Sequence, residues 1–138
     1  MSELSNPPKD KTRNYVTSKT GNLFLAAELA RRSKDSGIIS IAQNPGAANT
    51  ELFRHVPWMK ILAWPLLYKS SLAANTELFA GLAPEVKEGS GGYVVPWGRM
   101  AKGLRKDLLD AMKVEEEGGT GRAKEFWGFC EEVTRRYL

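Results

Sequence analysis

Apolar residues recur at helical spacing over residues 15–33 of this chain. One side of the predicted helix carries Val16, Leu23, Ala27 and Ala30, widened by Phe24 and Leu29. Asp10 or Thr12 precedes the run and can cap it, and Gly37 follows two arginines that fall in its last turn. The pattern therefore predicts one long amphipathic helix near the amino terminus.

Two short runs of β-branched and apolar residues predict strands. Residues 38–42 and 93–95 are almost continuously apolar, which is typical of strands covered on both faces of a parallel sheet. Pro45 and Gly46 close the first run, and Pro96 closes the second. A long helix followed by such a strand is half of a βαβ unit, so the fold class is α/β.

The remaining segments predict helices and turns. Helical spacing returns over 70–82 and 100–113, and a last apolar stripe contains Phe126, Phe129, Cys130, Val133 and Tyr137. Two prolines divide 52–68 into short pieces. We expect residues 1–13 to be a disordered polar lead-in and 14–138 to form one mostly helical unit with about two short parallel strands.

Composition narrows the class of protein. The 138 residues carry a net charge of +4 that is spread over many segments, so we expect a solvated surface and no nucleic-acid partner. One cysteine allows no internal disulfide, which suits a reducing compartment, and we expect a cytoplasmic protein. The sequence has no apolar run long enough to span a bilayer, and membrane contact is not expected. A single histidine, His55, and Cys130 lie far apart, so no metal site is predicted.

The sequence Tyr15-Val16-Thr17-Ser18-Lys19 carries the first candidate chemistry. Residues four apart lie one above the other on a helix, so the Lys19 ammonium can stabilise a Tyr15 phenolate. Such a pair can give a proton to a carbonyl oxygen or take one from an alcohol. In isolation, the same spacing more often marks a surface tyrosine beside a lysine.

Three segments together resemble one family. Tyr-Val-Thr-Ser-Lys-Thr-Gly-Asn from Tyr15, followed by Ala-Ala-Glu-Leu-Ala-Arg, is similar to the active-site helix of the short-chain dehydrogenases/reductases. Residues 45–50, Pro-Gly-Ala-Ala-Asn-Thr, resemble the Pro-Gly-x-x-x-Thr loop of that family. Residues 91–99 resemble the last strand of its retinol-dehydrogenase-like and fungal branches. The resemblance runs from about Tyr15 to the carboxyl terminus.

This resemblance implies a fold, a cofactor and roles for particular residues. It implies a partial Rossmann domain that binds NADP or NAD, with Tyr15 as the general acid and base. Lys19 would tune the tyrosine and hold the cofactor ribose. Four loop residues would line the nicotinamide end: Pro45, Gly46, Ala48 and Thr50.

Parts of the family pattern have no counterpart in the sequence. The glycine-rich phosphate loop, the serine upstream of the tyrosine and the acidic residue that contacts the adenosine ribose are all missing. We therefore expect the carboxyl-terminal half of such a domain, impaired as an isolated chain. It could be a truncated gene product, a mis-predicted reading frame or one half of a split assembly. We also expect apolar exposure along 38–42 and marginal stability as a monomer.

The sequence leaves two alternatives for the function of the chain. One is an oxidoreductase that reduces a carbonyl or oxidises an alcohol on an apolar substrate. The other is a non-catalytic remnant that pairs with itself or a relative through helices 15–33 and 70–83, the surfaces that the family uses for dimers. An aromatic and aliphatic cluster over residues 58–68 could be a substrate lid, ordinary core or a membrane contact.

Overall fold

The computed structural model describes residues 2–51, 54 and 57–137 of the chain. His55 lies outside this range. In chain order the elements are α1 Ser2–Ser5, α2 Lys11–Arg32, β1 Ala42–Gln43, α3 Pro57–Ala63, η2 Trp64–Leu66, α4 Ser70–Leu82, α5 Pro84–Glu88, β2 Tyr93–Val95, β3 Arg99–Met100, α6 Lys106–Met112, η3 Glu115–Glu117, α7 Arg122–Thr134 and η4 Arg135–Tyr137.

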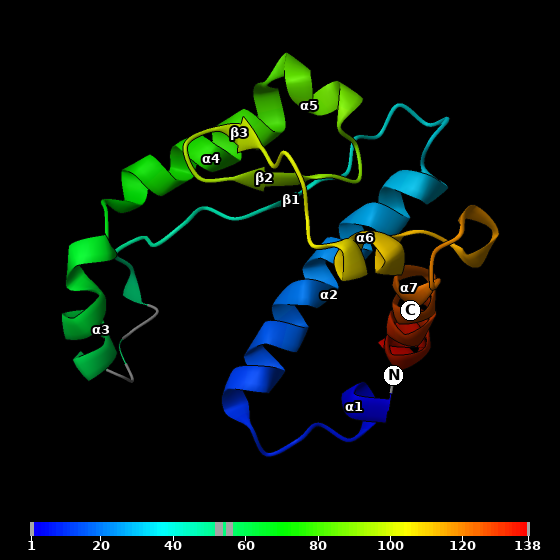
Figure 1. The fold of residues 1–138 in the computed structure, drawn as a ribbon, viewed down its shortest axis with the longest axis horizontal. Helices are drawn as coiled ribbons and strands as arrows, with labels where there is room; N and C mark the ends of the chain where they lie inside the picture. The colour runs from blue at the N-terminus through cyan, green and yellow to red at the C-terminus, as the bar shows by residue number, and fades with distance from the viewer. Residues whose placement is uncertain (1, 52–53, 55–56, 138) are drawn as a thin grey trace.

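The central feature is α2, which packs along α7 and also contacts α6 and β1. In Figure 1 this helix crosses the lower half of the molecule, with α7 beside its carboxyl-terminal part and the strands above it. Helix α2 begins at Lys11, earlier than the predicted Tyr15. The reason is Asp10, whose carboxylate accepts hydrogen bonds from the backbone N–H groups of Thr12 and Arg13 at 2.9 and 3.2 Å.

The strands form a small mixed sheet in the order β1-β2-β3. β1 pairs with β2 in parallel, as expected, with Ala42 opposite Tyr93. β3 adds an antiparallel strand that the sequence pattern did not predict, with Val94 opposite Met100. α4 also contacts β1 and β2, so the strands lie between α2 and α4 (Figure 1).

Two predicted elements are wrong in extent. The predicted strand 38–42 is strand only at residue 42, because β1 comprises Ala42–Gln43, and both Ile38 and Ile39 are exposed, as expected for an uncovered apolar run. The short β2 offers few partners, so ladder pairing ends after two residues. The predicted helix 100–113 is restricted to Lys106–Met112, because Met100 belongs to β3.

The core lies where α2 meets the strands. Leu23 and Ala26 of α2 pack with Ala42 of β1, and Tyr93, Leu104, Leu108 and Met112 close around them. Val94 in the middle strand is completely buried. Helix α4, predicted over 70–82, is confirmed with those bounds. The predicted disorder of residues 1–13 stays a prediction; α1 and the start of α2 fall within that range.

The described helices include none that is both long enough and apolar enough to cross a bilayer. Within the same residues, no group of three or more histidine, cysteine or acidic side chains is placed to hold a metal ion. Cys130 is half-buried on α7, and burial raises the pKa of its thiol.

Candidate functional site

The predicted proton-transfer pair lies in the first half of α2. Tyr15 and Lys19 are one helical turn apart, and the Lys19 ammonium lies 5.6 Å from the centroid of the Tyr15 ring. Tyr15 is 54% exposed, and Lys19 is also exposed. Among the described residues, neither the Tyr15 hydroxyl nor the Lys19 ammonium has a hydrogen-bond or ion-pair partner. Both polar groups are therefore available to a ligand.

Helix geometry places the pair on the sheet side of α2. Tyr15 and Lys19 share a helix face with Ala26 and Leu23, since residues four, seven and eight apart lie on one side. Leu23 and Ala26 bury against Ala42 of β1. The pair continues the same face beyond the core, toward the amino-terminal end of the helix.

The predicted loop follows β1 directly, at the carboxyl end of a parallel strand. Ligands bind at this end of strands in open α/β sheets. Asn44 begins the loop by accepting a hydrogen bond from the Gly46 N–H at 2.8 Å. Gly46 has φ +87°, and a side chain there would press on Pro96 and Tyr68, so only glycine fits. Ala48 forms a parallel bridge with Tyr68, and Thr50 ends the loop, exposed to solvent.

Tyr68 and Trp97 hold this loop in place. The sequence pattern does not predict this role for either residue. The Tyr68 hydroxyl donates to the Pro45 carbonyl oxygen, and the Tyr68 backbone binds Ala47 and Asn49 at 3.0 and 2.8 Å. The Trp97 ring lies against the Tyr68 ring with centroids 4.8 Å apart. Trp97 has φ +70°, a conformation that costs most residues energy.

Within the described residues, the two halves of the predicted site make separate sets of contacts. The contacts of the Tyr15 and Lys19 side chains stay within α2, and those of the loop run to Tyr68, Trp97 and Pro96. One further polar atom lies between them in sequence. Gln43 Oε1, at the end of β1, is buried and has no hydrogen-bond partner in the described part of the chain.

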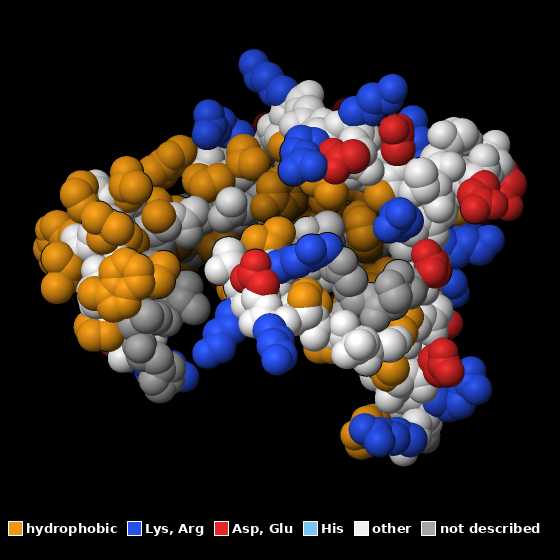
Figure 2. All heavy atoms as spheres, turned by 60° about the horizontal axis from the view of Figure 1, so that its bottom comes forward, with side chains coloured by type: hydrophobic (Ala, Val, Ile, Leu, Met, Phe, Trp, Pro, Cys, Tyr) orange, Lys and Arg blue, Asp and Glu red, His pale blue; other side chains and the backbone are white. Residues whose placement is uncertain are grey.

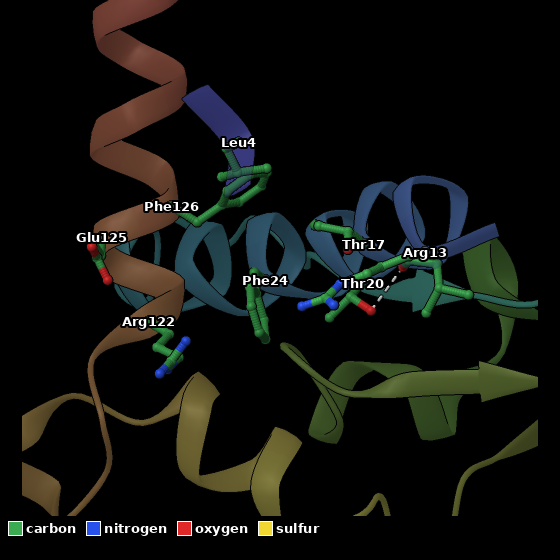
Figure 3. A pocket seen from close by; sticks show the side chains of 10 residues that line it. Leu4, Arg13, Thr17, Thr20, Phe24, Arg122, Glu125 and Phe126 are labelled. Carbon is green, nitrogen blue, oxygen red and sulfur yellow. Dashed lines mark hydrogen bonds between the residues drawn. The ribbon is translucent and has the colours of Figure 1, made fainter. Parts of the chain in front are cut away.

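A cavity on α2 does not belong to this site. It has a volume of about 440 Å³ and lies between α1, α2 and α7 (Figure 3). Its lining from α2 comes from Arg13, Val16, Thr17, Thr20, Gly21 and Phe24. These positions lie on the opposite side of the helix from Tyr15 and Lys19.

The charged residues at the other end of α2 have a structural role. Glu28 is 1% exposed and accepts hydrogen bonds from Arg31 at 2.6 and 2.8 Å and from Arg32 at 2.7 Å. The hydrogen bond from Arg31 lowers the pKa of Glu28, while burial acts in the opposite direction. Arg32 also stacks over the Trp127 ring of α7 at 4.9 Å. Through Arg32, these interactions stabilise the packing of α2 against α7.

Comparison with known proteins identifies the family. Short-chain dehydrogenase/reductase bet4 of Neocamarosporium betae is 40% identical over 134 residues, which cover 96% of this chain and 38% of that protein. Short-chain dehydrogenase/reductase iacJ of Pestalotiopsis fici is 36% identical over 141 residues, covering 100% of this chain and 42% of that protein. The chain belongs to the short-chain dehydrogenase/reductase family.

The similarity extends beyond these two proteins. A short-chain dehydrogenase/reductase of Phomopsis amygdali is 38% identical over 94% of this chain and 41% of its own length. The chain thus spans about two fifths of the length of the curated relatives it matches. No family model and no solved structure matches. Membership of this oxidoreductase family implies a Rossmann-type fragment and the cofactor NAD(P).

Proposed function

We propose that this chain carries the proton-transfer pair and the nicotinamide-side loop of an oxidoreductase that interconverts a carbonyl and an alcohol. The observation that carries the proposal is the Tyr15–Lys19 pair, exposed and unpartnered on the sheet side of α2. Homology to the short-chain dehydrogenases/reductases supports this assignment. The loop of Pro45, Gly46, Ala48 and Thr50, at the carboxyl end of β1, would line the nicotinamide end.

The chemistry assigned to the chain is a proton transfer. In the reducing direction Tyr15 donates its hydroxyl proton to the carbonyl oxygen, and in the oxidising direction the phenolate takes the alcohol proton. Lys19 would assist through its positive charge, since its ammonium lies 5.6 Å from the centroid of the Tyr15 ring. A nicotinamide cofactor, NADP or NAD, supplies or accepts the hydride when it is bound.

The residues of the chain fit one end of that cofactor. Lys19 has three N–H donors free for ribose hydroxyls, and the Tyr15 hydroxyl is free for the reacting oxygen. The close packing of Gly46 against Tyr68 and Pro96 fixes the loop backbone beside β1. The sequence contains no glycine-rich phosphate loop, so we expect this chain by itself to bind the cofactor weakly.

The substrate class follows from the apolar residues that come after the loop. Tyr68 and Trp97 border the loop with their aromatic rings. These side chains favour a bulky apolar carbonyl or alcohol over a small polar one.

Cofactor binding tests the proposal. We would measure energy transfer from tryptophan to NADPH and NADH in the wild type, in Lys19→Met and in the control Lys11→Met on the same helix. We expect saturable binding that Lys19→Met weakens at least about tenfold, since a charged donor is lost, and that Lys11→Met leaves unchanged. Absence of binding at millimolar cofactor would contradict the proposal. Together with a dimer in light scattering, that result would favour the non-catalytic remnant.

A further inference from the structure

Helix α3 and turn η2 expose apolar side chains on every side. Six large residues of this segment are exposed to solvent: Trp58, Met59, Ile61, Leu62, Trp64 and Leu66. A helix that is apolar all round is normally buried, and a contiguous exposed apolar patch marks an interaction surface. Figure 2 shows hydrophobic side chains gathered at the end of the molecule that holds α3, with charged side chains over the remainder.

The charged residues that lie within and beside this segment in the sequence are all basic. Between Glu51 and Glu77 the sequence contains Arg54, Lys60 and Lys69 but no aspartate or glutamate. Lys69 is exposed, and Lys60 borders an open apolar groove of about 460 Å³ together with Ile61 and Trp64. Basic side chains next to an exposed apolar segment are complementary to a surface that has an apolar interior and anionic groups at its boundary.

The length of the segment sets how it can lie. A seven-residue helix rises only about 10 Å, a third of the hydrocarbon thickness of a bilayer. Pro65 then bends the chain into η2. Tryptophans at 58 and 64 are suited to the boundary between headgroups and acyl chains, where one part of the ring is apolar and the N–H is solvated.

We propose that residues 57–69 bind the surface of an anionic phospholipid bilayer. The side chains of Trp58, Ile61 and Leu62 enter the acyl boundary, and Lys60 and Lys69 contact lipid phosphates. The sequence left this cluster open between a substrate lid, ordinary core and a membrane contact, and the exposure of its side chains favours the membrane contact. The proposal does not depend on the oxidoreductase assignment.

A second copy of the chain is a poorer occupant for this surface. In a twofold-symmetric contact the same patch meets itself, so Lys60 and Lys69 of one copy would face a patch that contains no acidic residue between positions 52 and 76. Like charges at an apolar contact oppose association. An anionic bilayer, in contrast, presents negative charge to Lys60 and Lys69 and attracts them.

Flotation with phosphatidylcholine vesicles, with or without phosphatidylserine, tests the proposal. We expect the wild-type chain to float with phosphatidylserine vesicles and much less with phosphatidylcholine alone. Ile61→Asp/Leu62→Asp should lower the partition coefficient at least about tenfold, since apolar burial is replaced by charge. The two side chains are 78% and 76% exposed, so the fold should be retained. Leu82→Asp is the matched control, because Leu82 is equally exposed at the far end of α4.

Charge removal and quenching test the orientation. Lys60→Gln and Lys69→Gln should each lower binding to phosphatidylserine vesicles about fivefold. Brominated lipid should quench a variant that keeps only Trp58 and Trp64. It should not quench one that keeps only Trp97 and Trp127, whose rings pack on Tyr68 and under Arg32.

Three results would overturn the proposal. The first is no flotation with phosphatidylserine vesicles. The second is equal flotation of the wild type and Ile61→Asp/Leu62→Asp. The third is a two-chain mass in light scattering that falls to one chain in Ile61→Asp/Leu62→Asp without vesicle binding, which would assign the patch to self-association.

Discussion

The two halves of helix α2 differ in almost every physical respect. The second half, from Gly21 to Arg32, contacts the strands and α7 and contains all the buried residues of the helix. The first half is largely exposed and carries Tyr15 and Lys19. The same helix is therefore packed against the core at one end and exposes polar side chains at the other. Packing fixes the position of two side chains whose polar groups have no hydrogen-bond or ion-pair partner among the described residues.

The largest expected difference between the halves comes from truncating one apolar side chain in each. Leu23→Ala should lower the free energy of unfolding by about 3 kcal/mol, because Leu23 is buried against Ala26 and Ala42. Val16→Ala should change it by less than about 0.5 kcal/mol, because Val16 is exposed. Urea denaturation of both variants measures the difference. Equal losses would show that the first half is packed as tightly as the second.

A smaller effect should follow from removing the charge of Glu28. Glu28→Gln weakens its hydrogen bonds to Arg31 and Arg32, and we expect a loss of about 2 kcal/mol in the free energy of unfolding at neutral pH. Glu132→Gln, at an exposed position of α7, is the control and should have almost no effect.

The Glu28 interaction also predicts a pH dependence. Its folded pKa lies below the ordinary value of 4.5, so its contribution is complete above that pH and is lost as the pH falls through the lower, folded value. Wild-type protein should lose stability over this acidic range, and Glu28→Gln should lose less. Parallel pH profiles for the two proteins would show that Glu28 is not the titrating group.

Two glycine substitutions give the smallest and most discriminating comparison. Gly128→Ala on α7 meets no atom within 4 Å and should stabilise the protein by about 1 kcal/mol through helix propensity. Gly21→Ala places a methyl group 2.8 Å from Phe126 Cζ and should be destabilising by about 1 kcal/mol after the propensity gain. Thermal unfolding ranks the two variants. A stabilising Gly21→Ala would mean that α2 and α7 do not pack closely.

Local patterns in the sequence predicted the parts of the fold that depend on neighbours in the chain. The bounds of α4 and β2 followed from apolar spacing and from the flanking glycines and prolines. The predicted helix 100–113 was wrong because Met100 pairs with Val94, a contact that no local pattern contains. The short β1 likewise depends on how many residues β2 offers as partners.

In the candidate site, too, some features depend on local sequence and others on contacts between distant parts of the chain. The Tyr15–Lys19 stacking follows from a spacing of four on a helix, so the sequence was sufficient to predict it. The roles of Tyr68 and Trp97 depend on a chain reversal that brings residues more than twenty positions apart to the loop after β1. The positive φ of Trp97 left no signal in the sequence either, because this conformation is associated with glycine and asparagine.

The central claim is that the exposed half of α2 presents Tyr15 and Lys19 to a nicotinamide cofactor. The most direct test is an NMR titration of the chain with NADPH, following the ring resonances of its 4 tyrosines, Tyr15, Tyr68, Tyr93 and Tyr137. We predict a saturable shift of Tyr15, a smaller one of Tyr68 beside the loop, none at Tyr137, and loss of the Tyr15 shift in Lys19→Met. An unchanged Tyr15 resonance at millimolar NADPH would contradict the claim.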